Sequence, residues 1–576
     1  MQKRKPEIDS GSIGNCENTN AVAIAKRARI SAPSTMTHSN DSTALQRCSN
    51  EAMLLIFSYL SSPDLAICSR VSRKFHSFAN DEIVWKGLFY DTFIRPRTMR
   101  AQRILSCAGL RKLRIEWFNR TANTIPHQVL SSAPSLSTTM SGGEWKALFK
   151  LHHNWHKGRC SIGAFDVSHL ASHAASKAAT VHTKATPEDL VVRFSGKLIF
   201  TADAEHGLCA WTNDGHLVSS TPVPKEYCDD KAIDGERKSR FPYGPPSALY
   251  VHASNNEQRA KETEKNSGEL LTVVVGFVHG GFAMYSMSTQ GTDFKLLHIQ
   301  RPRAYCEHQD LDPITSIVSE HPFVVTLSRL NRVEIYKFDA DAAEIASLIY
   351  TIRSHNITGP TTLSLRRARS TNVVYATIAY THTCISSGWT VAVQEIKLDD
   401  TSDNIVSLRA ASSLPSSSSP ASKRKTRFDY NHILWPSFSM PTSLSYAHPF
   451  LLTSHADNTL AVYHVRSTAS ELSIGPGCRL WGHTSAVANV EVQDRGRAVS
   501  ISQSGREMRV WDLEAAAIED VNKTQHAMES VRVVIDNYKD IDDEGRVGKF
   551  LGFDEEKVVV EQQRQRSRMV MVYDFT

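Results

Sequence analysis

The 576-residue sequence has no paired cysteines, no long apolar run and no strong excess of one charge. Its ten cysteines are scattered without a Cys-X-X-Cys pair, so neither a disulfide framework nor a zinc knuckle is indicated, and a reducing compartment fits. The longest strongly apolar run, residues 270–278, is far shorter than the ~20 residues of a membrane span. The first residues lack the apolar core of a secretory signal. We therefore expect no membrane partner.

Catalytic motifs are also missing. Neither Gly-Lys pair has the leading glycine and following Ser or Thr of a phosphate-binding loop, and no Gly-X-Ser-X-Gly elbow occurs. His152, His153 and His156 have no cysteine or acidic partner placed to complete a metal site. The net charge of +6 is mild for a nucleic-acid-binding protein, so nucleic acid is not an expected partner. The sequence predicts no catalytic residues, cofactor or metal, although a carboxylate pair assembled from distant positions stays open.

The most informative stretch is residues 50–89, which has the pattern of several short packed helices. One apolar stripe with helical spacing predicts the first of them: Met53, Ile56, Phe57 and Leu60. Ser62-Pro63 predicts a capped start of the second helix, and Asp81 predicts the cap of a later one. So short a segment cannot bury all of its apolar surface, and the remaining apolar face should meet a partner.

Motifs in this stretch resemble the F-box: IFSYL, then S-PDL, S-VSR-FH and A-D--VW, spread over about residues 46–92. The resemblance implies a docking module for the Skp-type adaptor of a cullin-based ubiquitin ligase. Family residues that face the adaptor map onto Ile56, Leu60, Pro63, Leu65 and Trp85. The sequence departs from the family at Cys48-Ser49, where a Leu-Pro pair is usual. The alternative is an ordinary helical subdomain that packs on its own chain.

Two segments flank this domain, which we assign to residues 44–95. The tail 1–43 is rich in Ser, Thr and Asn and is expected to be disordered. Its basic clusters at 3–5 and 26–29 indicate either nuclear import or a solvated tail, so nucleus and cytoplasm both stay open. Residues 96–157 are predicted to be a helical linker with a flexible gap. A helix is predicted at 144–152. The residues of this region that resemble the segment joining an F-box to a WD-repeat propeller, and making that connection rigid, are Trp145-Lys146, Leu148-Phe149, Asn154-Trp155 and Gly158.

From residue 158 on, strand-like runs alternate with turn residues. Residues 482–513 begin with Gly-His and end with Trp-Asp, and resemble a WD repeat, the unit of one β-propeller blade. The resemblance gives structural roles to His483, Ser502, Trp511 and Asp512, while Ser504 stands where a hydrogen-bonded tetrad usually has Asp. Degenerate repeats bring the candidate blades to seven: 198–212, 270–286, 314–338, 373–396, 442–465, 482–513 and 550–576.

The predicted fold is an α plus all-β multidomain protein, with a small helical F-box followed by a seven-bladed WD-like β-propeller over residues 158–576. Polar insertions lengthen the blades at 225–240, 255–267 and about 398–430, and the last is expected to be disordered. Residues 161–167 roughly alternate apolar and polar side chains. They are placed to add a strand to the last blade, which would close the ring and protect its edge.

Together the two resemblances indicate a fungal-type F-box protein with a C-terminal WD-like propeller, the substrate receptor of a Skp–cullin–F-box ubiquitin ligase. The expected partners are the Skp-type adaptor, through it the cullin, and a substrate protein on the propeller. Arginines near blade turns are either ordinary surface charges or ligands for a phosphorylated or acidic segment: Arg329, Arg332, Arg479, Arg506 and Arg509. The alternative function is a scaffold outside a ligase, such as a nuclear assembly platform.

Overall fold

The computed structural model describes residues 48–96, 144–166 and 190–576, the last range with gaps at 197, 205, 225–243, 254–269, 289–292, 303–311, 339–345, 354–356, 369–372, 385–387, 400–404, 414–438, 469, 476, 494–495, 506, 514–529, 536–545 and 564–567. Several predictions lie outside the described residues. They are the basic tail, the gap in the linker, the insertions at 225–240 and 255–267, and the role of Arg506.

The chain falls into two compact units, residues 1–56 and 57–576, with the boundary inside helix α2 (Asn50–Ser58). The described part of the first unit is the start of this helix. Ser49 caps it: its Oγ accepts a hydrogen bond from Ala52 N at 3.3 Å, and its carbonyl accepts one from Met53 N at 3.0 Å. The residue that replaces the proline of the F-box pattern thus has a local structural role as a helix cap.

The second unit begins with short helices: α3 (Ser62–Cys68), α4 (Arg73–Ala79), α5 (Glu82–Phe89) and the π-helical turn η1 (Tyr90–Ile94). Asp81 caps α5 as predicted, since its Oδ1 accepts from Ile83 N at 2.9 Å. The cap of α3 is Ser61, one residue before the predicted Ser62, and its Oγ accepts from Asp64 N. Phe57 packs edge-on to Phe75, with ring centroids 5.4 Å apart, in the core of these helices.

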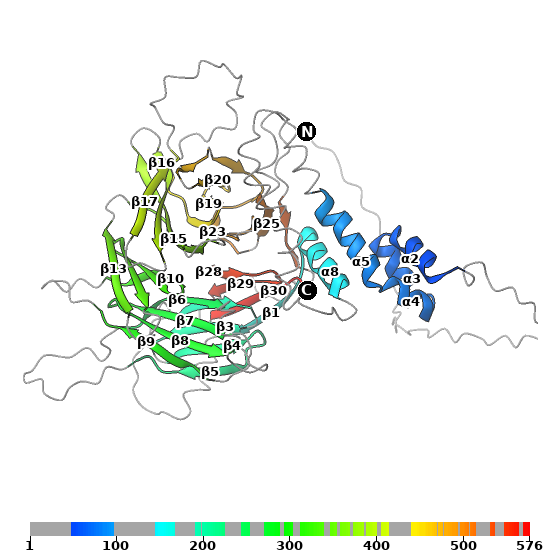
Figure 1. Cartoon of the computed structure of the whole chain (residues 1–576), viewed down its shortest axis with the longest axis horizontal. Coiled ribbons are helices and arrows are strands. Elements are labelled where there is room, and N and C mark those ends of the chain that lie inside the picture. Colours follow the sequence, from blue (N-terminus) through cyan, green and yellow to red (C-terminus); the bar gives the residue numbers. More distant parts are fainter. Residues whose placement is uncertain are drawn as a thin grey trace, which may run out of the picture. The chain divides into compact units, whose positions relative to one another are not determined.

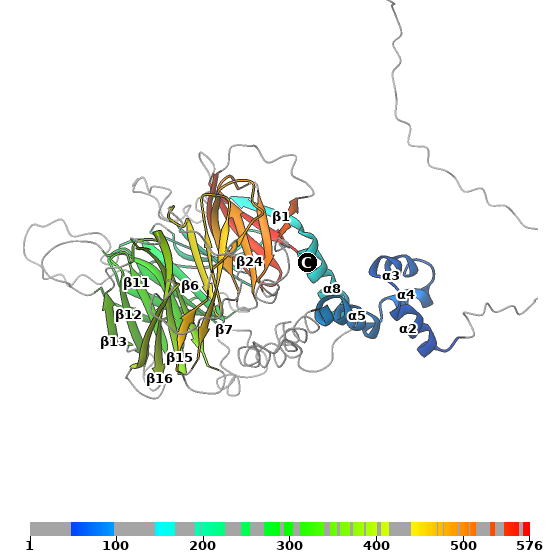
Figure 2. The ribbon, with the colours of Figure 1, turned by 90° about the horizontal axis from the view of Figure 1, so that it is seen from above.

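Helix α8 (Glu144–Lys157) leads directly into strand β1 (Arg159–Asp166) (Figure 2). After it, the described residues form seven sheets, one for each predicted blade. Blade 1 holds β2 (Val191–Ser195), β3 (Leu198–Asp203), β4 (Gly207–Thr212) and β5 (Leu217–Thr221). Blade 2 holds β6 (Pro246–Ala253), β7 (Leu270–Phe277), β8 (Phe282–Ser288) and β9 (Lys295–Gln300).

Blades 3 to 5 repeat the same antiparallel order. Blade 3 holds β10 (Ile314–Glu320), β11 (Phe323–Ser328), β12 (Arg332–Phe338) and β13 (Ala346–Arg353). Blade 4 holds β14 (Thr361–Arg367), β15 (Val373–Cys384), β16 (Gly388–Asp399) and β17 (Ile405–Ser412). Blade 5 holds β18 (Ser443–Ala447), β19 (Phe450–Ser454), β20 (Leu460–Ser467) and β21 (Leu472–Ile474), with β22 (Cys478–Leu480) also paired to β20.

Blades 6 and 7 share the end of the chain. Blade 6 holds β23 (Val487–Val492), β24 (Arg497–Ser502), β25 (Met508–Asp512) and β26 (Val531–Arg532). Blade 7 holds β28 (Arg546–Phe553), β29 (Lys557–Gln563) and β30 (Arg568–Asp574). Strand β1 completes it by pairing antiparallel with β30, with Ile162 opposite Tyr573 (Figure 1), and β27 (Val534–Ile535) pairs parallel to β1. The predicted closing strand at 161–167 is confirmed.

Apolar clusters between neighbouring blades form the ring. Because strand side chains alternate between two faces, each blade packs one face on the preceding blade and the other on the following blade. The ring closes where Ile199 and Trp211 of blade 1 pack with Val559 and Val570 of blade 7. The helical region followed by a seven-bladed β-propeller agrees with the predicted fold class.

One predicted boundary is wrong. Strand β17 (Ile405–Ser412) lies within the insertion predicted at 398–430, and it forms the outer strand of blade 4. Its side chains alternate between half-buried and exposed, and Ser, Arg and Ala fill several positions. An outer strand of this composition has a weak apolar pattern, and it resembles the low-complexity residues that follow it.

The propeller has one face on which the second and third strands of each blade are joined, which we call the bc face. Described turns of this kind include 278–281, 329–331 and 455–459. Because all blades have the same up-and-down order and pack in the same sense, these turns lie on one side of the ring. No helix among the described residues is long and apolar enough to cross a membrane.

Candidate functional site

The predicted adaptor-binding residues differ in how far the structure exposes them. Ile56 is 45% exposed, Pro63 is exposed and Leu60 is half-buried. Leu65 and Trp85 are buried, and Trp85 Nε1 donates to the carbonyl of Ala79 at 2.8 Å. Contact of the five with an adaptor stays a prediction. Ile56 and Pro63 are the members of the set whose side chains are most open to solvent.

Other apolar side chains of this helical region, on α3, α5 and the turns after α2 and α3, are exposed and were not predicted as adaptor contacts. Tyr59 is 82% exposed, Ile67 64% and Ile83 70%, and Val71 is exposed to the same extent as Ile67. Tyr59, Ile67 and Ile83 lie outside the apolar stripes that mark the helix cores, so periodicity assigns their positions to solvent. Val71 continues the spacing of Leu65 and Cys68, which predicts a buried position, yet it is exposed. The signal that could have found them is the presence of large apolar residues at positions where a helix normally carries polar ones.

Helix α8 packs on helix α5 through its first half. Trp145 N donates to Glu82 Oε2 at 3.2 Å, and Lys146 Nζ donates to Asn80 Oδ1 at 2.6 Å. The ring of Phe149 lies 5.3 Å from that of Trp85, at an angle of 61°. These contacts explain why Trp85 is buried: its ring lies in the junction between α5 and the linker helix α8.

The second half of α8 packs on the propeller. Trp155 stacks on Phe575 with ring centroids 3.8 Å apart, and its Nε1 donates to the carbonyl of Glu555 at 2.7 Å. The guanidinium of Arg497 covers the Trp155 ring at 4.6 Å, and Asn154 Nδ2 donates to the carbonyl of Phe575 at 2.7 Å. The predicted linker helix is present and extends to Lys157, and both of its ends make specific contacts.

The histidines of α8 take part in packing. His156 stacks on Phe93 with centroids 5.2 Å apart, and His152 lies edge-on to Phe89 at 5.1 Å. Among the residues that the structure describes, no three His, Cys, Asp or Glu side chains gather as a metal site requires.

The hydrogen-bonded network of blade 6 differs from the prediction in one residue. Ser500 Oγ, not Ser502 Oγ, accepts from Trp511 Nε1 at 2.7 Å and lies 2.6 Å from His483 Nε2. Ser502 instead caps the following turn, where its Oγ accepts from Glu507 N at 3.1 Å. Residues 500 and 502 share one face of β24 because side chains alternate with period two, so sequence spacing could not separate them. Asp512 ends β25 opposite Arg497.

Glu507 supplies the carboxylate that the predicted tetrad lacked. Its Oε2 accepts from Thr484 N at 2.9 Å and lies 3.4 Å from His483 Nδ1, while its Oε1 accepts from Arg509 Nε at 2.7 Å. Burial alone would raise its pKa, but the hydrogen bonds from Thr484 and Arg509 lower the pKa of Glu507 to about 2. Burial also lowers the pKa of His483. The network therefore joins the segment before β23 to β24 and β25.

The predicted arginines lie at the bc face but in different settings. Arg509 is held by Glu507 and also donates from Nη1 to Ser530 Oγ at 2.7 Å, so its role is structural. Arg479 pairs with Asp457 at 3.3 Å and lies over the exposed ring of Trp481. Arg332 pairs with Asp312 at 3.5 Å inside a cavity, and Arg329 is exposed on the neighbouring turn.

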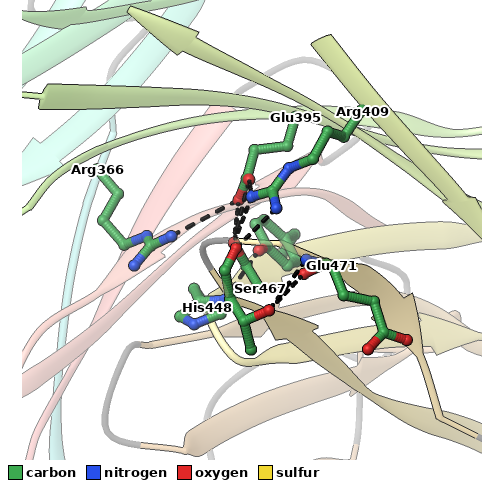
Figure 3. A network of polar contacts seen from close by, with 8 residues as sticks. Arg366, Glu395, Arg409, His448, Ser467 and Glu471 are labelled. Carbon is green, nitrogen blue, oxygen red and sulfur yellow. Dashed lines mark hydrogen bonds and ion pairs between the residues drawn. The ribbon is translucent and has the colours of Figure 1, made fainter. Parts of the chain in front are cut away.

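A second polar network joins blades 4 and 5 (Figure 3). Glu395 of β16, 1% exposed, pairs with Arg409 of β17 and lies 3.6 Å from Arg366 Nη2. Ser467 Oγ at the end of β20 approaches both carboxylate oxygens, at 3.0 and 2.8 Å. Arg409 Nη1 donates to the carbonyl of Thr468 at 2.6 Å. One buried carboxylate on β16 thus joins its own strand to β14, β17 and β20, four strands of two blades.

Comparison with known proteins agrees with this architecture. Residues 175–576 match the family described as F-box protein pof12 beta-propeller, and residues 50–91 match the F-box-like family. A relative in Schizosaccharomyces pombe (strain 972 / ATCC 24843), F-box protein pof12, is 30% identical over 131 residues, which are 22% of this chain and 25% of that protein. The chain therefore matches about a quarter of that relative's length.

Two solved propellers are also similar. One is the WD40 beta propeller domain of Doa1, with 10% identity and a TM-score of 0.31 over 68% of this chain and 94% of that one. The other is Saccharomyces cerevisiae Sqt1, with 12% identity and a TM-score of 0.33 over 68% of this chain and 85% of that one. The family match covers most of this chain, and its boundaries contain blades 1 to 7 from β2 onward. The protein belongs to the F-box protein pof12 beta-propeller family.

Proposed function

We propose that this protein is the substrate-recognition subunit of a Skp–cullin–F-box ubiquitin ligase. The observation that supports this most is the concentration of exposed apolar side chains on its F-box-like segment. Seven of the sixteen exposed large apolar side chains among the described residues lie between Leu55 and Tyr90. Exposed apolar surface at this density favours a protein partner, and F-box domains generally bind Skp-type adaptors.

In this proposal the chain is not an enzyme but contributes proximity. The helical end binds the adaptor and, through it, the cullin, while the WD-like propeller binds the protein to be ubiquitinated. Helix α8 contacts both α5 and the propeller, and an ordered helix loses less entropy on assembly than a flexible linker does. Raising the effective concentration of the two reactants is then the chain's contribution to ubiquitin transfer and degradation.

An adaptor pull-down tests this function. Immobilised Skp-type adaptor should retain the full chain, and Ile67→Asp combined with Ile83→Asp should weaken retention at least tenfold, because both side chains are exposed and a charge there opposes an apolar interface. Leu217→Asp on β5, where the side chain is also exposed, is the matched control and should change nothing. Failure of the unmodified chain to bind the adaptor would refute the proposal.

The alternative is a scaffold that uses its F-box-like segment outside a ligase, for example in a nuclear assembly. Ubiquitin transfer separates the two functions. A reconstituted complex with adaptor and cullin should attach ubiquitin to proteins that the propeller retains from an extract. Adaptor binding without such transfer would favour the scaffold. Nuclear or cytoplasmic location, which the basic tail leaves open, can be read from a fluorescent fusion of the full chain.

A further inference from the structure

Helix α8 carries basic side chains along one face, which we call the open face of α8. Lys146, Lys150, His153 and Lys157 follow one another at intervals of four, three and four residues. At about 100° per residue, these four positions lie within a sector of roughly 60° on the helix surface. The three lysines are exposed and His153 is half-buried. With a rise of about 1.5 Å per residue, the stripe is about 16 Å long.

The other faces of α8 are occupied by packing. Phe149 packs near Trp85 and Trp155 stacks on Phe575, and both side chains are buried. None of the large apolar side chains of α8, all of which the structure describes, is among the exposed ones. An interaction at the open face therefore depends on charge and not on apolar contact.

The lysines of the open face have no acidic partner. Lys146 Nζ donates to the amide oxygen of Asn80 at 2.6 Å and lies 5.5 Å from the centre of the Trp85 ring, and both of these groups are uncharged. Among the described residues, no carboxylate forms an ion pair with Lys150, Lys157 or, just beyond the helix, Arg159. These charges are therefore available to a partner.

The pKa of His153 reflects this excess of positive charge. Burial lowers the pKa of its imidazole, and the charges of Lys157 and Arg159 lower it further. A nearby carboxylate would raise the pKa instead, and no carboxylate is among the groups that influence it. The electrostatic potential beside the open face of α8 is therefore positive and uncompensated.

The composition of the open face favours an acidic protein segment over other polyanions. Single-stranded nucleic acid binds to exposed aromatic rings, and an anionic membrane surface binds an apolar face beside the basic one, but the open face of α8 has neither. Lysine is a compact point charge and lacks the planar fork with which arginine matches phosphate. At about 3.3 Å per residue, an extended segment of roughly five residues covers the stripe.

We propose that the open face of α8 is a docking surface for an aspartate- or glutamate-rich segment of a partner protein, with Lys146, Lys150 and Lys157 as its contacts. Because α8 contacts α5 at one end and the propeller at the other, the bound segment lies between the two. Exposed charges of this kind mainly raise the rate of association and orient the partner. This docking surface does not depend on the proposed ligase function.

Fluorescence anisotropy with the full-length chain tests this proposal. The probe is a labelled peptide of alternating glutamate and serine, and the reference is the same peptide with glutamine in place of glutamate. At low salt the glutamate peptide should bind at least about tenfold more tightly, because several weak surface ion pairs form together. The difference should vanish in ~1 M salt, where the Debye length is ~3 Å.

Two variants of α8 connect this binding to the open face. Lys150→Glu combined with Lys157→Glu should abolish the preference for the glutamate peptide at low salt. Lys150→Gln combined with Lys157→Gln removes the charges without reversing them and should give an intermediate preference. Neither lysine has an ion pair inside the chain, so both variants should keep the thermal midpoint of the natural chain. An unchanged preference in either folded variant would overturn the proposal.

The matched control changes the net charge equally at a distance from α8. Lys295→Glu combined with Arg329→Glu alters two exposed positions of the propeller and should leave peptide binding unchanged. A loss as large as that of the α8 variant with glutamates would show that binding follows net charge, and the proposal would be wrong. Equal binding of the glutamate and glutamine peptides by the natural chain would refute it as well.

Two further arms separate the class of partner and the two proposals. If a single-stranded oligonucleotide of equal charge displaces the glutamate peptide more strongly than that peptide itself does, the surface binds nucleic acid and the assignment to a protein segment is wrong. The Ile67→Asp and Ile83→Asp variant should bind the peptide normally. Normal peptide binding by a natural chain that fails to bind the adaptor would reject the ligase function and support the docking surface.

Discussion

The ring of Trp155 stacks on that of Phe575, with centroids 3.8 Å apart and an angle of 8° between the planes. The last helix before the propeller is therefore packed on the second-last residue of the chain. We expect Trp155→Ala to remove this stack, the Arg497 contact and the hydrogen bond to Glu555. Truncation of a buried tryptophan costs about 3–5 kcal/mol, so α8 should separate from the propeller.

Hydrogen exchange measures this effect directly. The amides of α8 should lose protection in Trp155→Ala, and the thermal midpoint of the chain should fall. Lys150→Ala, at an exposed position of the same helix, is the control and should leave both unchanged. Unaltered protection of α8 in Trp155→Ala would show that the stack does not hold the helix.

The end of α8 predicts a strong effect at a glycine. Gly158 has φ = +65°, and a Cβ there would lie inside contact distance of the Arg532 carbonyl oxygen and 2.9 Å from Val531 Cγ1. Gly158→Ala should therefore strain the backbone at residue 158 and push β26 away from it, and the thermal midpoint should drop clearly. Gly87→Ala, within α5 and with no atom within 4 Å of the new Cβ, should stabilise by up to ~1 kcal/mol. Equal midpoints for the two variants would contradict this reading.

The network of blade 6 predicts different costs for two serines. Ser500→Ala leaves Trp511 Nε1 and His483 Nε2 without their shared hydroxyl in a buried site, which costs about 1–3 kcal/mol. Ser502→Ala removes the hydrogen bond from Glu507 N and the contact with Ser504 Oγ, both within one turn, and should cost about 1 kcal/mol. Tryptophan fluorescence and thermal unfolding of both variants provide the comparison. A larger loss in Ser502→Ala would restore the role that the sequence pattern suggested for that residue.

The sequence predicts most of the fold because blades repeat a local pattern. Strand runs that end in Trp211 or Tyr336 identify blades 1 and 3, and alternation at 161–167 identifies the closing strand. The sequence did not predict strand β17, because its half-exposed residues lack that alternation of apolar and polar types.

The candidate sites are less predictable because they join residues that are distant in the chain. Arg301 and Arg353 reach one cavity through the order of the strands, and neither lies in a motif. Arg509 lies near a turn like other candidate arginines, yet Glu507 and Ser530 engage it inside the blade. Burial of Trp85 depends on Phe149, which lies on a separate helix.

The buried carboxylate between blades 4 and 5 predicts a strong effect of one isosteric change. Glu395→Gln leaves Arg366 and Arg409 without their counter-charge (Figure 3) and should cost of the order of 3 kcal/mol, since breaking a buried ion pair leaves uncompensated charge. The control is Glu471→Gln at an exposed position, where the backbone rather than the carboxylate bonds to Thr468. The measurement is the loss of stability of each variant in thermal unfolding. A loss no larger than that of the control would show that the network adds little to the junction.

Glu491 on β23 predicts the pH dependence of stability. Burial raises the pKa of its carboxyl from 4.5 to about 7, against the opposing influence of Arg193. The folded state therefore binds more protons than the unfolded state between about pH 4.5 and 7, and this group's contribution to stability falls as pH rises through that window.

Glu491→Gln removes this titration. Since one pKa unit corresponds to about 1.4 kcal/mol, the variant should gain roughly 1–3 kcal/mol over the natural chain at pH 8 and little or nothing at pH 4.5. The measurement is the difference in thermal midpoint between the two chains across this pH range. In that difference, the contributions of groups that titrate in both chains cancel. A flat difference for Glu491→Gln would mean that water reaches the carboxylate and that burial does not shift its pKa.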